Sequence, residues 1–231
     1  MLSETIRFSN GRHAKLVRAS RYEDLSGAFR SLGLEAGCPV LVFITGAASV
    51  EEKDLEVIQQ TADRIARVAE RIGAAIIDGG TQAGGMEAMG ASCARRGYSF
   101  PLIGVAAEGT VSLPDTPLGE DQWILDPNHN FFILSPGDQW GQETPWISET
   151  ATQLAGKAPS ITVLTNGGAI ARNDIATSLA AKRPVYVLKG TGRLADELAE
   201  DPQYNEMVKI IPAQDGEELE DALMQALSPK L

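Results

Sequence analysis

A strand, a glycine-rich turn and the start of a helix follow one another in Ala74-Ala75-Ile76-Ile77-Asp78-Gly79-Gly80-Thr81-Gln82-Ala83-Gly84-Gly85-Met86. The apolar run before Asp78 has the length of a buried strand, and a helical pattern continues to Arg96. Glycine allows a sharp turn and a close approach of a ligand to the backbone, and a helix start presents unpaired N–H groups. An ordinary strand-to-helix turn has the same pattern, so this stretch becomes a ligand-site prediction only together with others like it.

The same alternation of strands and helices extends outward in both directions along the chain. Apolar strands are predicted at residues 40–46, 74–78, 101–106, 131–134, 161–164, 184–188 and 208–211. Helices are predicted at 51–72, 84–96, 144–154, from the turn at 166–168 to 181, after 193, and at 217–227. In the first long helix the apolar residues recur at helical spacing: Leu55, Ile58, Ile65, Val68 and Ile72. This pattern predicts an α/β fold, a Rossmann-like three-layer sandwich with a mostly parallel sheet.

The first 34 residues have a different pattern from the rest of the chain. Residues 5–8 and 14–18 are expected to pair as a small hairpin across Asn10-Gly11, followed by a helix at 24–34. No linker is evident, so we predict a single domain over residues 1–231, with an N-terminal β extension (1–34) and a core (38–231). An irregular segment at 107–129 is long enough to suggest that it lines a site.

Composition excludes several classes of protein. A formal net charge of -11 disfavours nucleic acid as a partner, because the two would repel each other at long range. No apolar run is long enough for membrane insertion, and the polar start from Met1 to Lys15 has no secretory signal, so we expect a cytoplasmic protein. Cys38 and Cys93 provide neither a disulfide framework nor a zinc spacing, and no metal site is predicted.

Several predicted strands end in a glycine-bearing turn. These turns are Thr45-Gly46, Asp78-Gly79-Gly80, Asn166-Gly167-Gly168 and Lys189-Gly190-Thr191-Gly192-Arg193. In open parallel sheets, ligands bind beyond the carboxyl ends of the strands, so the repeated pattern favours a ligand site there. The turns match neither the usual dinucleotide fingerprint nor a P-loop.

Three ordered motifs carry a resemblance to a known family. The turn at 78–86 is similar to the Gly-Gly-x-x-x-Gly-x-Met turn of the SLOG superfamily. Leu125-Asp126-Pro127-Asn128-His129-Asn130-Phe131 and Gly190-Thr191-Gly192-Arg193-Leu194-Ala195-Asp196 resemble motifs of the cytosolic nucleotide-binding region of TRPM cation channels. The chain therefore resembles a free-standing prokaryotic relative of that region (LSDAT type), over residues 38 to 200. The resemblance implies binding of nucleotide derivatives, which are ADP-ribose in TRPM relatives and nucleoside monophosphates in the LOG-type hydrolases.

A set of ligand-binding residues follows from the turns and from the resemblance. N–H groups from Gly79 to Met86 are expected to cradle a phosphate, with hydrogen bonds added by Thr81 and Gln82. Arg193 is placed to grip a phosphate bidentately, the alternative being a surface arginine paired with Asp196 or Glu197. The full predicted set is Thr45, Gly46, Gly79, Gly80, Thr81, Gln82, Gly84, Gly85, Met86, Trp140, Asn166, Gly167, Gly168, Gly190, Thr191, Gly192 and Arg193.

Two positions are judged from the resemblance to the TRPM relatives. Trp140 matches an aromatic residue there and could stack on an adenine, or it could simply pack in the core. An arginine of those relatives is replaced here by Ile147, which removes a phosphate partner and puts ADP-ribose in doubt.

A catalytic role is the less favoured hypothesis. The stretch Asn166-Gly167-Gly168-Ala169-Ile170-Ala171-Arg172-Asn173-Asp174 lacks the leading Pro, the third Gly and the Thr of the LOG motif Pro-Gly-Gly-x-Gly-Thr-x-x-Glu. Asp174 and Glu143 are the only weak catalytic candidates. His129 is interpreted as a residue that orders its loop by hydrogen bonds, in preference to a base or a metal ligand.

We therefore expect a module that binds or senses an ADP-ribose-related, NAD-related or nucleoside phosphate ligand, with nucleotide N-glycosidase activity as the alternative. No cofactor is required by this hypothesis. An effector protein and a homo-oligomer are the expected partners by analogy with related folds.

Overall fold

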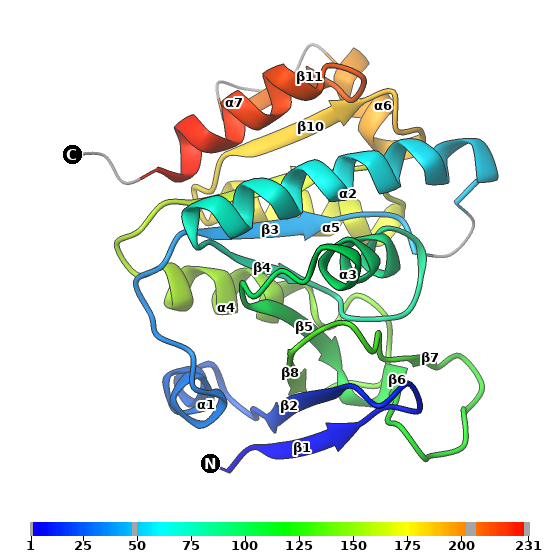
Figure 1. The fold of residues 1–231 in the computed structure, drawn as a ribbon, viewed down its shortest axis with the longest axis vertical. Helices are drawn as coiled ribbons and strands as arrows, with labels where there is room; N and C mark the ends of the chain where they lie inside the picture. Colours follow the sequence, from blue (N-terminus) through cyan, green and yellow to red (C-terminus); the bar gives the residue numbers. More distant parts are fainter. Residues whose placement is uncertain (1, 48–49, 202–206, 229–231) are drawn as a thin grey trace.

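The computed structural model describes residues 2–47, 50–201 and 207–228. Figure 1 shows its elements in chain order. The strands are β1 (Glu4–Arg7), β2 (His13–Arg18), β3 (Val40–Ile44), β4 (Ala75–Asp78), β5 (Leu102–Ala107), β6 (Val111–Ser112), β7 (Trp123–Ile124), β8 (Phe131–Ser135), β9 (Ser160–Leu164), β10 (Val185–Lys189) and β11 (Val208–Pro212). The helices are α1 (Leu25–Leu32), α2 (Glu52–Ile72), α3 (Gly84–Arg96), α4 (Thr144–Ala155), α5 (Ala169–Ala180), α6 (Arg193–Glu200) and α7 (Gly216–Leu227), with 3-10 turns at Tyr22–Asp24 and Glu108–Thr110.

Nine strands form one sheet in the order β1-β2-β8-β5-β4-β3-β9-β10-β11. Every neighbouring pair is parallel except β1 and β2, which form the antiparallel hairpin. All five residues of the interior strand β3 are buried, because both faces of the sheet are covered. Val40, Val42 and Ile44 contribute to one core cluster, whereas Leu41 and Phe43 contribute to the other. The predicted α/β fold with a mostly parallel sheet is confirmed.

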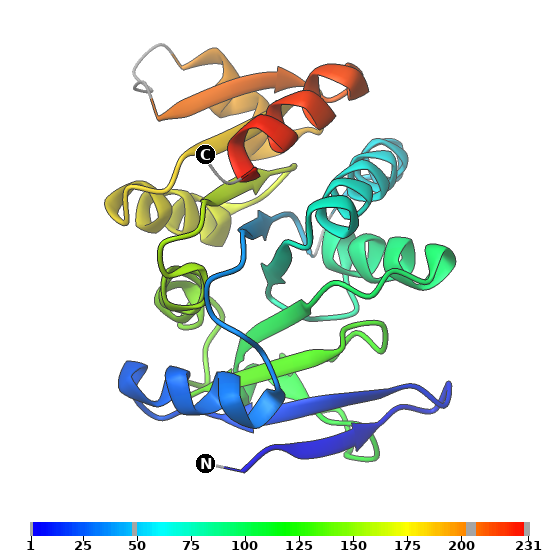
Figure 2. The same cartoon turned by 60° about the vertical axis from the view of Figure 1, so that its left-hand side comes forward.

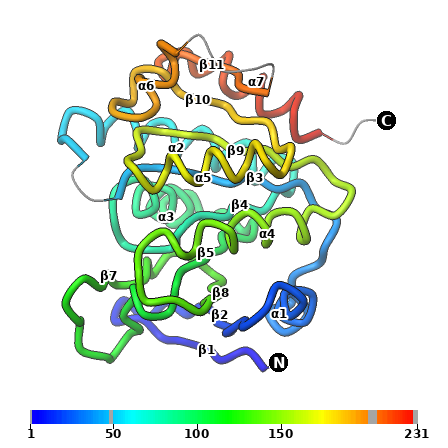
Figure 3. The backbone as a smooth tube through the Cα atoms, turned by 180° about the vertical axis from the view of Figure 1, so that it is seen from behind, coloured from blue at the N-terminus to red at the C-terminus, as the bar shows by residue number. Residues whose placement is uncertain are grey.

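Helices cover the two faces of the sheet as separate layers. Helices α2, α3 and α7 pack on one face, and α1, α4, α5 and α6 pack on the other. Figure 2 shows the sheet between α2 and α3 on one side and α1, α4 and α5 on the other. Figure 3, seen from behind, shows α4 and α5 in front of the strands. The helical spacing of α2 predicted its buried face correctly at Ile58 and Ile65, but Leu55 is exposed.

The N-terminal hairpin is part of the main sheet. Strand β2 pairs in parallel with β8, in the register Leu16 to Phe132, and both of these side chains are fully buried. Helix α1 adds Leu25, Phe29 and Leu32 to the core cluster that also holds α4 and α5. The predicted extension therefore shares the sheet and the core of the rest of the chain. Across the described residues, no helix has both the length and the apolar character needed to traverse a bilayer.

Candidate functional site

The strand order reverses beside β3, and this is where a cavity opens. After β3 the chain builds β4 and β5 on one side, and it later returns to place β9 on the other side. Loops leave the carboxyl ends of β3 and β9 in opposite directions, which is the usual position of ligand sites in such sheets. A cavity of about 380 Å³ lies there. It is lined by Phe43, Ile44, Thr45, Gly46, Ala47, Gly79, Thr81, Met86, Ala106, Trp123, Trp140, Glu143, Ile147, Gly168, Ala169, Ile170, Ala171, Asp174 and Arg193.

One side of the cavity can hold an anion. It is formed by Gly168 and the first turn of α5, residues 169–171. Among the described residues, no protein group accepts a hydrogen bond from the three N–H groups of this turn. The guanidinium of Arg193 lies against Gly168, where a Cβ would be only 2.6 Å from Nη2. A helix start and an arginine at one place are a combination that binds phosphate or carboxylate groups.

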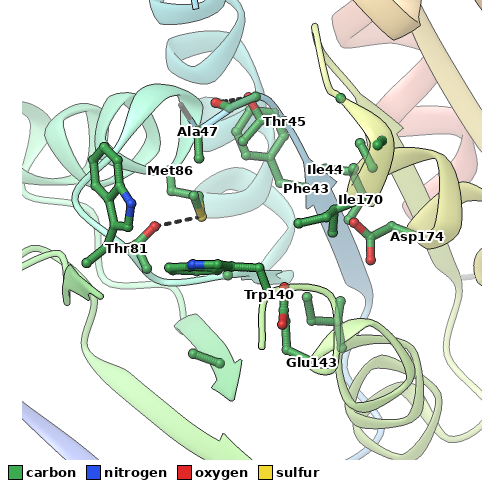
Figure 4. Close-up of a pocket in the computed structure, with 18 of the residues that line it drawn as sticks. Phe43, Ile44, Thr45, Ala47, Thr81, Met86, Trp140, Glu143, Ile170 and Asp174 are labelled. Atoms are coloured by element: carbon green, nitrogen blue, oxygen red, sulfur yellow. Dashed lines mark hydrogen bonds between the residues drawn. The ribbon is translucent and has the colours of Figure 1, made fainter. Parts of the chain in front are cut away.

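Two indole rings line the same cavity. Trp123, on β7, and Trp140, just before α4, keep 38% and 37% of their surface exposed. Nε1 of Trp140 donates a hydrogen bond to the carbonyl oxygen of Asp121 at 2.9 Å, which ties this ring to the segment that carries Trp123. Figure 4 shows Trp140 between Thr81 and Glu143 in the cavity. Half-exposed aromatic faces of this kind can stack on a planar ring.

Two buried carboxyl groups, Glu143 and Asp174, also line the cavity. Burial raises the pKa of Asp174 to about 7; the hydrogen bond from Thr144 lowers it, and the nearby Glu143 raises it further. That bond runs from Thr144 Oγ1 to Asp174 Oδ1 at 2.5 Å. Burial also raises the pKa of Glu143, although its carboxylate accepts a hydrogen bond from the N–H of Gly141 at 2.9 Å. Asp174 is therefore suited to exchange a proton near neutral pH.

Part of the turn at 78–86, which we expected to cradle a phosphate, uses its N–H groups for bonds within the protein. Asp78 Oδ1 accepts the N–H of Gly80 at 2.7 Å, and the N–H of Gln82 donates to Ile124 at 2.9 Å. The N–H of Gly85 donates to the carbonyl of Gly46 at 3.1 Å. Within this turn only Gly79, Thr81 and Met86 line the cavity, so its glycines mainly serve close packing. The N–H groups of Gly79 and Thr81 donate to no described protein group, as is also the case for those in the first turn of α5.

The predicted turns at 166–168 and 189–193 are joined by hydrogen bonds next to the cavity. The N–H of Asn166 donates to Thr191 Oγ1 at 2.8 Å, and Asn166 Nδ2 donates to the carbonyl of Thr191 at 2.8 Å. Both residues are fully buried. The carboxylate of Asp196 accepts the N–H groups of Gly190 and Gly192. These bonds fix the turn from which Arg193 extends.

The cavity thus brings together only part of the predicted set. Thr45, Gly46, Gly79, Thr81, Met86, Trp140, Gly168 and Arg193 line it, as do the catalytic candidates Glu143 and Asp174. Gly80, Gln82, Gly84, Gly85, Asn166, Gly167, Gly190, Thr191 and Gly192 do not. Sequence reasoning missed Trp123, although it lies in the long irregular segment that was expected to line a site. It also missed Ile170, whose apolar side chain carries no chemical signal.

The alternative interpretation of Arg193 involved two acidic residues. Asp196 caps the glycine turn described above, and Glu197 forms an ion pair with Arg172 at 2.7 Å. Both acids are therefore engaged with other groups.

His129 is buried away from the cavity and orders its loop, as predicted. Its Nε2 lies 2.8 Å from Asp78 Oδ1, and its Nδ1 lies 3.0 Å from Asp126 Oδ1. Burial lowers its pKa, but the charge of Asp78 and the hydrogen bonds to both carboxylates outweigh this and raise the pKa to about 10. The charged ring therefore joins the loop at 126–129 to the end of β4.

Fold and cavity together define a Rossmann-like ligand-binding domain. The chain belongs to the family described as SLOG in TRPM, prokaryote, whose model matches residues 38–226. Over 199 residues it is 28% identical to the transient receptor potential cation channel subfamily M member 2 of Rattus norvegicus. The matched stretch covers 70% of this chain and 13% of the channel. The chain thus spans a small part of that relative.

Two solved structures share the fold at low sequence identity. One is a molybdenum cofactor binding protein from Rippkaea orientalis, with a TM-score of 0.55, 16% identity and coverage of 81% of this chain and 98% of that one. The other is the molybdenum cofactor carrier protein from Chlamydomonas reinhardtii, with a TM-score of 0.55 and 16% identity. The match covers 81% of this chain and 99% of that protein. This likeness concerns the fold alone.

Proposed function

We propose that the protein binds a nucleotide-derived ligand in this cavity, as a binding or sensing module. The phosphate would lie against the first turn of α5 and the guanidinium of Arg193. The base would stack on Trp140 or Trp123. The ligand would then span the carboxyl ends of β3 and β9.

A single observation carries this proposal: an anion-binding side and an aromatic side line the same cavity. Nucleotides combine a charged phosphate with a planar base, and few other small metabolites offer both. The net charge of -11 does not oppose this proposal, because local N–H groups and one arginine act at short range. The family relation to the N-terminal part of a channel supports a sensing role.

The proposal is tested by calorimetry and thermal shift with AMP, ADP-ribose, cyclic ADP-ribose and NAD. We expect saturable binding of at least one of them, weakened at least tenfold by Arg193→Ala. Arg172→Ala is the matched control, because Arg172 lies one turn along α5, pairs with Glu197 and is absent from the cavity lining. Equal loss in both variants, or no binding by the wild type, would contradict the proposal.

A second function is favoured by Glu143 and Asp174, whose raised pKa values suit general acid and base catalysis. The reaction would be hydrolysis of a nucleoside monophosphate. Water would add to C1′ of the ribose as the N-glycosidic bond breaks, which yields ribose phosphate and the protonated base.

Chromatography of each nucleotide after long incubation separates the two functions. Release of free base by the wild type, abolished in Asp174→Asn, would establish the hydrolase. Intact nucleotide after saturable binding would leave the binding function alone.

A further inference from the structure

We propose that the cavity accepts a nucleotide with one phosphate and rejects ligands that carry a diphosphate. This inference rests on the proposed function, because it concerns the same cavity and the same anion-binding side. It selects among the nucleotide ligands that the proposed function leaves open.

The charges around the cavity support one phosphate. Among the described residues that line it, Arg193 is the one cation, and Glu143 and Asp174 are acidic. One phosphate can lie between Arg193 and the N–H groups of α5. A second phosphate would find no further basic side chain in this described lining.

The neighbouring helix α3 offers fewer unbonded N–H donors than α5. The N–H of Gly85 in the first turn of α3 donates to Gly46, and that of Met86 donates to Ala83 at 3.2 Å. Of the first three N–H groups of α3, two are therefore engaged within the protein, whereas all three of α5 donate to no described protein group. An uncompensated phosphate in a partly buried site is strongly disfavoured.

Apart from the hydroxyl groups of Thr45 and Thr81, the remaining side chains that line the cavity are apolar, aromatic or acidic. Ile147 and Ile170 cover part of the surface, and Ile147 is almost completely buried. Figure 4 shows Asp174 beside Ile170 and Glu143 beside Trp140. A diphosphate that reached from α5 toward the indoles would therefore pass apolar and carboxyl side chains that offer it no positive charge.

The size of the cavity also favours a ligand with a single phosphate. Its volume of about 380 Å³ lies near the lower end of the range for ligand pockets, which is roughly 300–1,000 Å³. A base, one ribose and one phosphate need less room than a dinucleotide-sized ligand.

The test is calorimetry of the full chain with AMP, ADP and ADP-ribose in a buffer free of divalent cations. ADP differs from AMP by one phosphate, so it isolates the effect of charge, and ADP-ribose adds the effect of size. We expect AMP to bind at least tenfold more tightly than either diphosphate.

A cation placed in the apolar wall should change this preference. Ile147→Arg is expected to narrow the AMP-to-ADP ratio by about tenfold, whereas Ile147→Met, of similar volume, should leave the ratio unchanged. Thermal melting of each variant checks that it is folded, and the wild-type ratio remains a test on its own.

The outcomes separate the two proposals. Binding of ADP or ADP-ribose as tightly as AMP would overturn the single-phosphate inference and leave nucleotide binding in place. Absence of saturable binding by all three would overturn both.

Discussion

At the scale of single residues, a missing side chain sets the distance between two walls of the cavity. Gly85 lies in the first turn of α3, and a Cβ at this position would be 2.0 Å from Thr45 Oγ1, at the end of β3. Its N–H also donates to Gly46. The glycine thus lets α3 contact the segment after β3, and this contact orients both Thr45 and Gly46 in the cavity lining.

Gly85→Ala should therefore destabilise the fold by about 1–3 kcal/mol, the usual cost of overpacking a close contact. The free energy of unfolding is measured in urea. Gly27→Ala in α1 is the control, because its nearest outside atom would be 4.0 Å away, and alanine there should be neutral or slightly stabilising. Equal stability of the Gly85→Ala variant and the wild type would show that the contact relaxes without cost.

His129 gives a prediction on the pH dependence of stability. Its pKa of about 10 in the folded chain is above the ordinary value of 6.5. Its ion pairs therefore stabilise the fold fully below about pH 6.5, and this contribution is lost as the pH rises through 10. We expect the difference in unfolding free energy between wild type and His129→Gln to be largest at pH 6 and to shrink toward pH 10.

The control for this experiment is His13→Gln, because His13 is exposed at the start of β2. Its difference from the wild type should be small at every pH. A difference for His129→Gln that stays constant from pH 6 to pH 10 would mean that the ring is not charged in the fold.

At the scale of elements, the start of α5 is where the charge of the cavity is arranged. Gly168 caps this helix in an extended conformation that alanine can also adopt. A Cβ there would meet only the far end of the flexible Arg193 side chain. The position therefore controls where the guanidinium lies without holding the helix together.

Gly168→Ala should displace the guanidinium and weaken phosphate binding by about tenfold, with little change in melting temperature. Affinity is measured by calorimetry with AMP, and stability by thermal melting. Adenosine is the control ligand, since it has no phosphate and its affinity should not change. A loss of stability that accompanies the loss of affinity would instead assign Gly168 a structural role.

At the scale of the whole molecule, the N-terminal segment and the core share one sheet. Strand β2 is the parallel neighbour of β8, and α1 covers the same face as α4 and α5. Removing this segment would expose apolar side chains that are now fully buried, among them Phe132. The segment is therefore expected to be required for folding.

A chain that starts at residue 37 should lack a cooperative thermal transition, whereas a chain that starts at residue 4 should melt like the full protein. Near-ultraviolet circular dichroism and thermal melting measure this. Cooperative unfolding of the shorter chain near the wild-type temperature would show that the core folds without β1, β2 and α1.

The sequence alone determined the main helices and strands and the fold class. This is because the spacing of apolar residues and the residue types in turns are local properties of the chain. Residues 84–96 were predicted as a helix with the bounds that the structure has, and the apolar runs became the strands of a parallel sheet. Arg193, Gly168 and Trp140, which follow strand ends in the sequence, line the cavity at the carboxyl edge of the sheet.

Only the tertiary structure decided which residues of each glycine turn face the cavity and which are engaged within the protein. The turns after β4 and β9 look alike in sequence, yet in the first the N–H groups of Gln82 and Gly85 donate to Ile124 and Gly46, whereas the N–H groups in the first turn of α5 donate to no described protein group. Trp123 reaches the same cavity from a segment with no local signal. The reason is physical: hydrogen-bond partners and cavity walls come from strands far apart in sequence, and their order in the sheet brings them together.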